Sequence, residues 1–115
     1  MQKLFNLTAA PGRRKKNKTP EGLLTEDVRR LLKTLGVWHW KQHQGLGSIK
    51  GVSDIIGIWR GKFLAIELKA PRGVLSDEQI AFMESVRQNG GVAFMAKTLD
   101  DVIDGLGVRD KFRRF

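Results

Sequence analysis

Two apolar runs, residues 52–59 and 62–68, are separated only by Arg60-Gly61. Runs of this length with so few polar residues are typical of strands that are buried on both faces. A two-residue connection predicts a tight β-hairpin, because loops of that length are the commonest hairpin turns. The centre of the fold is therefore expected to be two adjacent antiparallel strands, with position 59 opposite 62 and position 54 opposite 67. A three-residue loop would shift this register by one.

Helix and strand signals continue on both sides of the hairpin. Thr19-Pro20 predicts a helix start and Gly36 its end, and Ser76 and Thr98 each begin a capping sequence. The expected elements are a helix over residues 19–35, a strand over 37–42, the two hairpin strands, a helix over 76–89, a strand over 92–96 and a short helix over 98–105. This order, α-β-β-β-α-β-α, predicts an α/β fold in which helices flank a mixed sheet.

Apolar spacing predicts the inner faces of the first two helices. In the first helix, positions 24, 28, 31 and 35 share one face, and Glu21 lies on the same face one turn earlier. In the second helix, Ile80, Met83 and either Val86 or Arg87 mark the face that should pack on the sheet.

The net charge of +9 is carried by the two ends of the chain. Residues 1–20 hold six basic and no acidic side chains, residues 105–115 hold four basic and one acidic, and residues 21–104 hold eleven of each. Basic ends favour a polyanionic partner such as DNA. We expect residues 1–18 to be a basic, flexible arm and residues 19–115 to form one domain with a basic C-terminal end. The densest run would make salt-sensitive phosphate contacts, or would simply be a solvated tail; its basic residues are Arg13, Arg14, Lys15, Lys16 and Lys18.

Other classes of protein are excluded by what the composition lacks. The chain has no cysteine, so disulfides and thiolate metal sites are ruled out. No apolar stretch approaches the roughly 20 residues that span a bilayer, and the apolar run at the start is too short for a secretory signal. We therefore expect a protein that is neither secreted nor membrane-bound. It would be cytoplasmic, and nucleoid-associated if encoded by a bacterium or a phage.

Only two carboxylates, Asp54 and Glu67, lie between Asp27 and Asp77. The hairpin register places them opposite one another with Cβ atoms about 5 Å apart, and Lys69 shares their face. Two ionised carboxylates at such a short distance repel each other, and a divalent cation bound between them removes this repulsion. Mg²⁺ prefers such hard oxygen ligands, and Lys69 would stabilise charge at a scissile phosphate. The alternative is a surface ion pair between Glu67 and Lys69.

Asp54 followed by Glu67-Leu68-Lys69 resembles the signature of the PD-(D/E)xK nuclease superfamily. The flanking sequence resembles its virus-type replication-repair branch, VRR-NUC, over about residues 20–105. The similar segments are Trp40-Lys41 with Gly45, and residues 50–57, 63–71, 75–79 and 90–93. One departure is Ser53, which stands where the superfamily has proline and should alter turn rigidity more than chemistry. The resemblance implies a restriction-endonuclease-like core.

The resemblance also implies roles for single residues. It assigns metal ligation, by Mg²⁺ or Mn²⁺, to Asp54, Glu67 and the backbone carbonyl of Leu68, with Lys69 catalytic. The family has a glutamate early in its first helix, which corresponds to Glu21. The alternative for Glu21 is a first-turn acid that the helix dipole favours. Gln79 resembles the family's helix glutamine near the active site, and its alternative is a capping-box residue.

The remaining polar and aromatic candidates are assigned less directly. Lys41 stands where the family often has arginine, so it and Lys50 are expected to contact DNA, although Lys41 could simply be solvated. A metal role for His39 and His43 is disfavoured. The three tryptophans are more often core or interface residues than platforms for stacked bases; they are Trp38, Trp40 and Trp59.

The resulting hypothesis is a metal-dependent DNA endonuclease. The family resemblance implies structure-selective cleavage in replication, repair or recombination, and for a short stand-alone member it implies a homodimer that cuts Holliday junctions. Two alternatives stay open from the sequence. One is a nucleic-acid-binding module without catalysis, and the other is a nuclease subunit that works only inside a larger complex.

Overall fold

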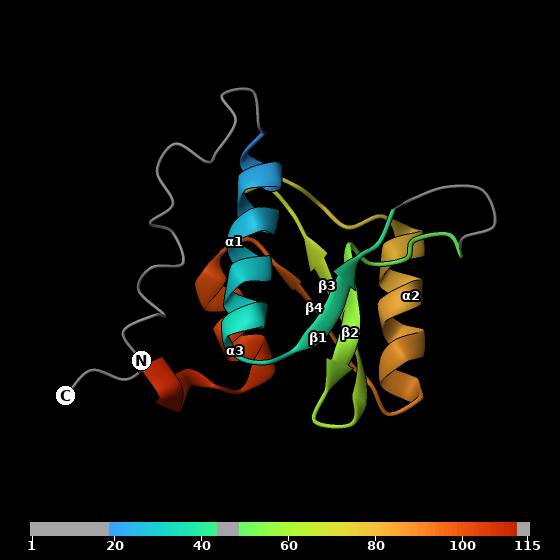
Figure 1. Ribbon diagram of the computed structural model, residues 1–115. Helices are drawn as coiled ribbons and strands as arrows, with labels where there is room; N and C mark the ends of the chain where they lie inside the picture. Colours follow the sequence, from blue (N-terminus) through green and yellow to red (C-terminus); the bar gives the residue numbers. More distant parts are fainter. Residues whose placement is uncertain (1–18, 44–48, 113–115) are drawn as a thin grey trace.

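The computed structural model of the chain describes residues 19–43 and 49–112, which form a sheet between two helical layers (Figure 1). Helices α1 and α3 cover one face of the sheet, and α2 covers the other. The elements in order are α1 (Pro20–Thr34), β1 (Trp38–Lys41), β2 (Ile55–Trp59), β3 (Lys62–Leu68), α2 (Asp77–Gln88), β4 (Val92–Ala96), α3 (Leu99–Leu106) and a final 3₁₀ turn, η2 (Arg109–Phe112). This confirms the predicted order and fold class, with η2 as an unexpected addition.

The sheet is mixed, with strand order β1-β2-β3-β4. The pairs β1–β2 and β2–β3 are antiparallel, whereas β3 and β4 are parallel. Trp59 pairs with Lys62 and Ile55 with Ile66, so the predicted hairpin register is confirmed. Arg60 (φ 53°) and Gly61 (φ 79°) both have positive φ, as the common two-residue turn with matching twist requires.

The helix ends follow the capping chemistry that the sequence predicts. The Oγ1 atom of Thr19 accepts a hydrogen bond from the backbone N–H of Gly22 at 3.0 Å, and Pro20 occupies the first position of α1. Gly36, with φ 77°, follows the last turn. In the described part of the chain no helix is both long and apolar enough to cross a bilayer.

Buried side chains form two clusters, one on each face of the sheet. The larger cluster lies under α1 and α3, and its members include Leu31, Leu32, Ile55, Ile66, Leu68 and Val102. The smaller cluster lies under α2 and contains Ile56, Ala65, Met83, Val86 and Ala93.

The inner face of α2 differs from the prediction at its start. Ile80 is 45% exposed, whereas Met83 and Val86 are buried. Gln79 faces the sheet instead, through a hydrogen bond to Glu67. Positions 79, 83 and 86 follow the helical repeat, so the stripe that packs on the sheet begins with a polar residue. The start of β2 also differs, because residues 52–54 precede the strand rather than belong to it.

Candidate active site

The hairpin brings the predicted acidic pair together at one end of the sheet. Asp54 immediately precedes β2, and Glu67 is the second-last residue of β3. The backbone N–H of Leu68 donates to the Oδ2 atom of Asp54 at 2.8 Å. The carbonyl of Asp54 accepts from the N–H of Gln42 at 2.7 Å. Asp54 is therefore tied to the strands on both sides of it, and its carboxylate is directed toward the end of β3.

Glu67 is the most buried charged side chain of the site, with 3% of its side chain exposed. Its Oε2 atom accepts a hydrogen bond from Nε2 of Gln79 at 3.0 Å and lies 3.9 Å from Nζ of Lys69. Its Oε1 atom is buried and has no hydrogen-bond partner among the described residues. The alternative of a surface ion pair between Glu67 and Lys69 is therefore wrong.

The surroundings of Glu67 favour its neutral form. Burial, and after it the charge of the neighbouring Asp54, raise the pKa of Glu67 to about 8. The positive charge of Lys69 acts in the opposite direction, and Glu21 makes the smallest contribution. The surroundings of Glu67 therefore favour a protonated side chain near neutral pH, and a cation bound beside it would favour the ionised form instead.

Gln79 uses both ends of its side-chain amide. Its Oε1 accepts from the backbone N–H of Ser76 at 2.9 Å, and Oγ of Ser76 accepts from the N–H of Gln79 at 3.1 Å. This reciprocal capping box leaves Nε2 directed at Glu67. Gln79 therefore forms the capping box and contacts Glu67 at the same time, so the two roles that the sequence offered as alternatives do not exclude each other.

Lys69 is held by the turn that follows it. Its backbone N–H donates to the carbonyl of Ala96 at 3.0 Å, which continues the β3–β4 pairing. A Cβ atom on Gly73 would lie 3.1 Å from both Cβ and Cδ of Lys69, so the turn packs closely along the lysine stem. Nζ of Lys97 donates to the carbonyl of Pro71 at 2.8 Å and fixes the turn from the other side.

The site provides two carboxylates as possible ligands for a hard divalent cation. Asp54 and Glu67 supply carboxylate oxygens, and the unpartnered Oε1 of Glu67 is the kind of atom that a cation or a proton satisfies. Within residues 19–43 and 49–112, no three His, Cys, Asp or Glu side chains converge on one point. Glu21 is half-buried in the first turn of α1, close enough for its charge to act on Glu67 but not grouped with the pair. Two carboxylates still suffice, because Mg²⁺ usually takes one or two from the protein.

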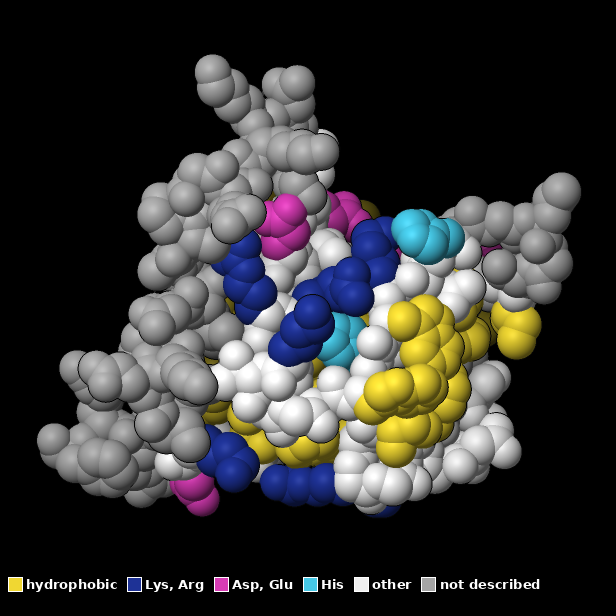
Figure 2. Space-filling view, viewed as in Figure 1, with side chains coloured by type: hydrophobic (Ala, Val, Ile, Leu, Met, Phe, Trp, Pro, Cys, Tyr) yellow, Lys and Arg dark blue, Asp and Glu magenta, His cyan; other side chains and the backbone are white. Residues whose placement is uncertain are grey.

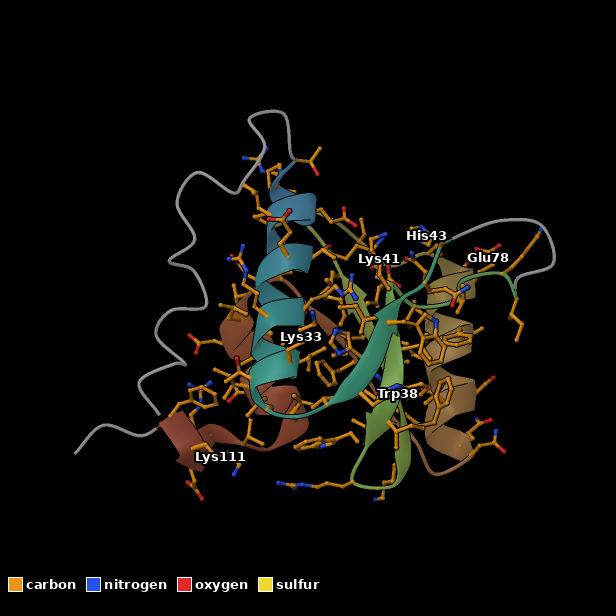
Figure 3. The ribbon with its side chains drawn as sticks, in the orientation of Figure 1. Lys33, Trp38, Lys41, His43, Glu78 and Lys111 are labelled. Carbon is orange, nitrogen blue, oxygen red and sulfur yellow. The ribbon has the colours of Figure 1, made fainter. Side chains whose placement is uncertain are left out.

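The predicted DNA contacts are placed only in part. Lys41 is half-buried at the end of β1, and Figure 3 shows it beside His43, at the same end of the molecule as Glu78 at the start of α2. Lys50 is exposed. The five basic residues of the run 13–18 lie outside the described residues.

His39 is engaged at both of its ring nitrogens. Nε2 of His39 accepts from Nε of Arg29 at 3.4 Å, and its Nδ1 lies 2.9 Å from the carbonyl of Val37, so the ring joins β1 to α1. Burial lowers the pKa of His39, which keeps the imidazole neutral in this position.

Two residues before Asp54 support the site in ways that the sequence did not indicate, since Gly51 was not singled out and Ser53 was noted only as a departure from the family signature. A Cβ atom on Gly51 would overlap the backbone of Glu78 and Gln79, so the segment before Asp54 lies directly on the first turn of α2. Ser53 is fully buried, and its Oγ has no hydrogen-bond partner in the described part of the chain. The glycine next to the acidic motif is the one signal that could have marked this backbone contact.

The family model of the VRR-NUC domain matches residues 14–98. A solved structure described as a VRR_NUC domain protein is similar to the chain with a TM-score of 0.53 and 21% sequence identity, over 99% of this chain and 90% of that chain. At this identity the likeness establishes the fold alone. No curated protein sequence matches. Because the family model covers most of the chain, including the Asp54 and Glu67-Leu68-Lys69 motifs, the protein belongs to the VRR-NUC family of nucleases.

Proposed function

We propose that the chain is a divalent-metal-dependent endodeoxyribonuclease. The observation that carries this proposal is the pairing of half-buried Asp54 with buried Glu67, with an oxygen of Glu67 that has no partner among the described residues and Nζ of Lys69 3.9 Å from its other oxygen. Burial makes a charged pair costly without a counter-ion. If both carboxylates are ionised they carry two negative charges, and among the described residues Lys69 is the cation whose charge acts on Glu67. Such a site is suited to a cation that arrives with a phosphodiester substrate.

The proposed metal ligands are Asp54, Glu67, the carbonyl of Leu68 and, on the family resemblance, Glu21. When bound, Mg²⁺ or Mn²⁺ would supply acidified water and charge stabilisation at the phosphate. The chain's own residues prepare the site for this. The N–H of Leu68 fixes Asp54, Gln79 holds one oxygen of Glu67, and Lys69 adds a positive charge where negative charge develops on the phosphate.

A cleavage panel tests the proposal. Purified protein is incubated with duplex, flap, fork and four-way junction DNA, in Mg²⁺, in Mn²⁺ and in a chelator. We expect cleavage only with metal, and its loss in Asp54→Asn, Glu67→Gln and Lys69→Ala. Matched controls are Asp77→Asn and Lys62→Ala, an exposed acid and an exposed lysine that lie outside the site. Wild-type cleavage by all three site variants would overturn the proposal.

The finer proposal concerns the substrate and the assembly. We infer that the chain acts as a homodimer on branched DNA such as Holliday junctions, in replication, repair or recombination, because two-fold symmetry suits paired incisions across a junction. This is supported by membership of the family rather than by a contact between copies. A chain that sediments as a monomer at its working concentration and leaves junctions uncut would contradict it.

A further inference from the structure

An exposed apolar groove lies on the face of the sheet that α2 covers. Trp38 is 66% exposed and Trp40 41% exposed, and their rings meet edge to face with centroids 5.2 Å apart. Phe63 is also exposed, and Phe82 of α2 forms the opposite wall. Figure 2 shows hydrophobic side chains gathered in one patch over this side of the molecule. Monomeric proteins rarely leave a contiguous aromatic surface of this kind without a partner.

The strand register places the groove beside the catalytic pair. Trp40 pairs with Ile56 of β2, and Ile56 lies two residues after Asp54, which immediately precedes the strand. Two residues of a strand span about 7 Å. The aromatic surface therefore begins one strand over and two residues along from Asp54 and runs away from it along β1, with Trp38 at the opposite end of β1 from Lys41 (Figure 3).

The groove has the size and lining of a binding site. Its part next to Trp40 has a volume of about 330 Å³, and a second part of about 560 Å³ continues along α2. The two parts share Ile49, Phe63 and Phe82, so they form one continuous depression. The walls are apolar and aromatic, and Lys50 and Glu78 are the charged residues of the lining.

The chemistry of the groove points to the bases of the substrate rather than to its phosphates. Aromatic faces stack on nucleobases of any sequence, whereas apolar walls do not bind phosphate. Lys41 lies on β1 next to Trp40, and Lys50 lines the groove, so positive charge is available to the backbone of the same strand. A second protein chain seated here would crowd the approach to Asp54 and Glu67, whereas a nucleic acid strand would lead into it.

We propose that this groove takes up unpaired bases next to the scissile phosphate, stacked on Trp40, which lines the groove, and on Trp38, whose ring packs edge to face against Trp40 beside it. The proposal rests on the nuclease function proposed above and adds a physical basis for selecting DNA with single-stranded character. A duplex keeps its bases stacked inside the helix and cannot fill the groove, whereas a fork or a flap offers them freely.

The test compares two DNAs that differ only in a single-stranded arm. Binding of the blunt duplex and of the armed duplex is measured by fluorescence anisotropy, with every protein in the Lys69→Ala background so that the DNA stays intact. We expect Trp38→Ala and Trp40→Ala each to weaken binding of the armed DNA by about 10-fold while changing blunt-duplex binding by less than about 2-fold. Trp38→Phe, which keeps an aromatic face, should retain most of the affinity.

Trp59 provides the matched control, because its indole N–H is bound to the carbonyl of Leu106 and its ring lies under Arg60, away from the groove. Trp59→Phe should leave both affinities unchanged. The emission of the two remaining tryptophans should then be quenched by the armed DNA and not by the blunt duplex. Thermal unfolding of each variant checks that the exposed substitutions leave the fold intact.

Two results of these measurements would overturn the proposal. Equal losses on both DNAs would mean that Trp38 and Trp40 contact the duplex or support the fold. Unchanged DNA binding, together with a dimer that Trp38→Ala converts to monomers in sedimentation, would assign the surface to a second copy of the chain. Failure of the wild-type chain to cleave any DNA with metal would instead refute the nuclease function itself, whereas normal cleavage without the arm effect refutes the groove alone.

Discussion

The ionised form of Glu67 is unfavourable in the folded protein, so the contribution of Glu67 to the free energy of unfolding depends on pH. The side chain is buried, one oxygen has no partner, and Asp54 lies against it. Its ordinary pKa is near 4.5, whereas in the folded protein it is about 8. Between those values the folded chain binds a proton that the unfolded chain has released. The free energy of unfolding therefore falls as pH rises from about 4.5 to about 8.

Glu67→Gln should remove this dependence. Without metal, we expect the variant to be more stable than the wild type by about 2–5 kcal/mol at pH 8.5, with the difference closing toward pH 4.5. The measurement is urea unfolding at several pH values in a chelator, with Glu84→Gln, an exposed acid on α2, as control. Added Mg²⁺ should narrow the difference at pH 8.5, because it binds the folded wild type. A variant that is less stable than the wild type at high pH would show that burial of the ionised Glu67 side chain does not destabilise the folded protein.

At the scale of the elements, the α2 capping box links helix stability to the site. Ser76→Ala should cost about 1 kcal/mol of stability, because it removes the hydroxyl that accepts from the backbone N–H of Gln79. The backbone N–H of residue 76 still donates to Oε1 of Gln79, but the less stable first turn of α2 should hold the Gln79 amide less firmly against Glu67. Thr98→Ala is a matched control, because Thr98 and Asp101 form the same box at the start of α3. We expect both variants to lose similar stability in thermal unfolding, but only Ser76→Ala to lose cleavage rate. Equal rates in the two variants would show that the box does not position Gln79.

The elements also show why the sequence predicted some features and missed others. The hairpin register followed from a two-residue loop, since every pair is fixed once the turn is known. The capping boxes followed from local sequence as well. Ile80 was assigned to the inner face because spacing alone ranks an apolar residue above Gln79, and only the contact with Glu67 reverses that order. The turn that packs against Lys69 is fixed by a hydrogen bond from Lys97 to the carbonyl of Pro71. These two residues are 26 positions apart, and no local sequence pattern indicates such a contact.

At the scale of the whole molecule, a backbone contact at Gly51 joins the segment that carries Asp54 to the helix that carries Gln79. Gly51 and Gly36 have nearly the same φ, 79° and 77°, but a Cβ atom on Gly36 would meet open space. Gly36→Ala should therefore cost about 1 kcal/mol, from backbone strain alone. Gly51→Ala should cost about 3 kcal/mol or more, because the segment and α2 must also move apart. Chemical unfolding measures both, and similar losses would contradict the contact.

The distribution of charge over the whole chain gives a last prediction. Residues 21–104 hold equal numbers of acidic and basic side chains, so an attraction to DNA that reaches beyond the site must come from the ends. Each phosphate contact changes the slope of log affinity against log salt by about 0.9 on duplex DNA. Replacing Arg13, Arg14, Lys15, Lys16 and Lys18 with serine should therefore flatten that slope by up to about 4 to 5.

Affinity for blunt and branched DNA should fall alike in this variant, because phosphate contacts do not distinguish the structure of the DNA at the cleavage point. Cleavage of bound DNA should keep its rate, since these residues are remote in sequence from Asp54 and Lys69. A salt titration of both DNAs tests this, and an unchanged slope would show that the run is only a solvated tail.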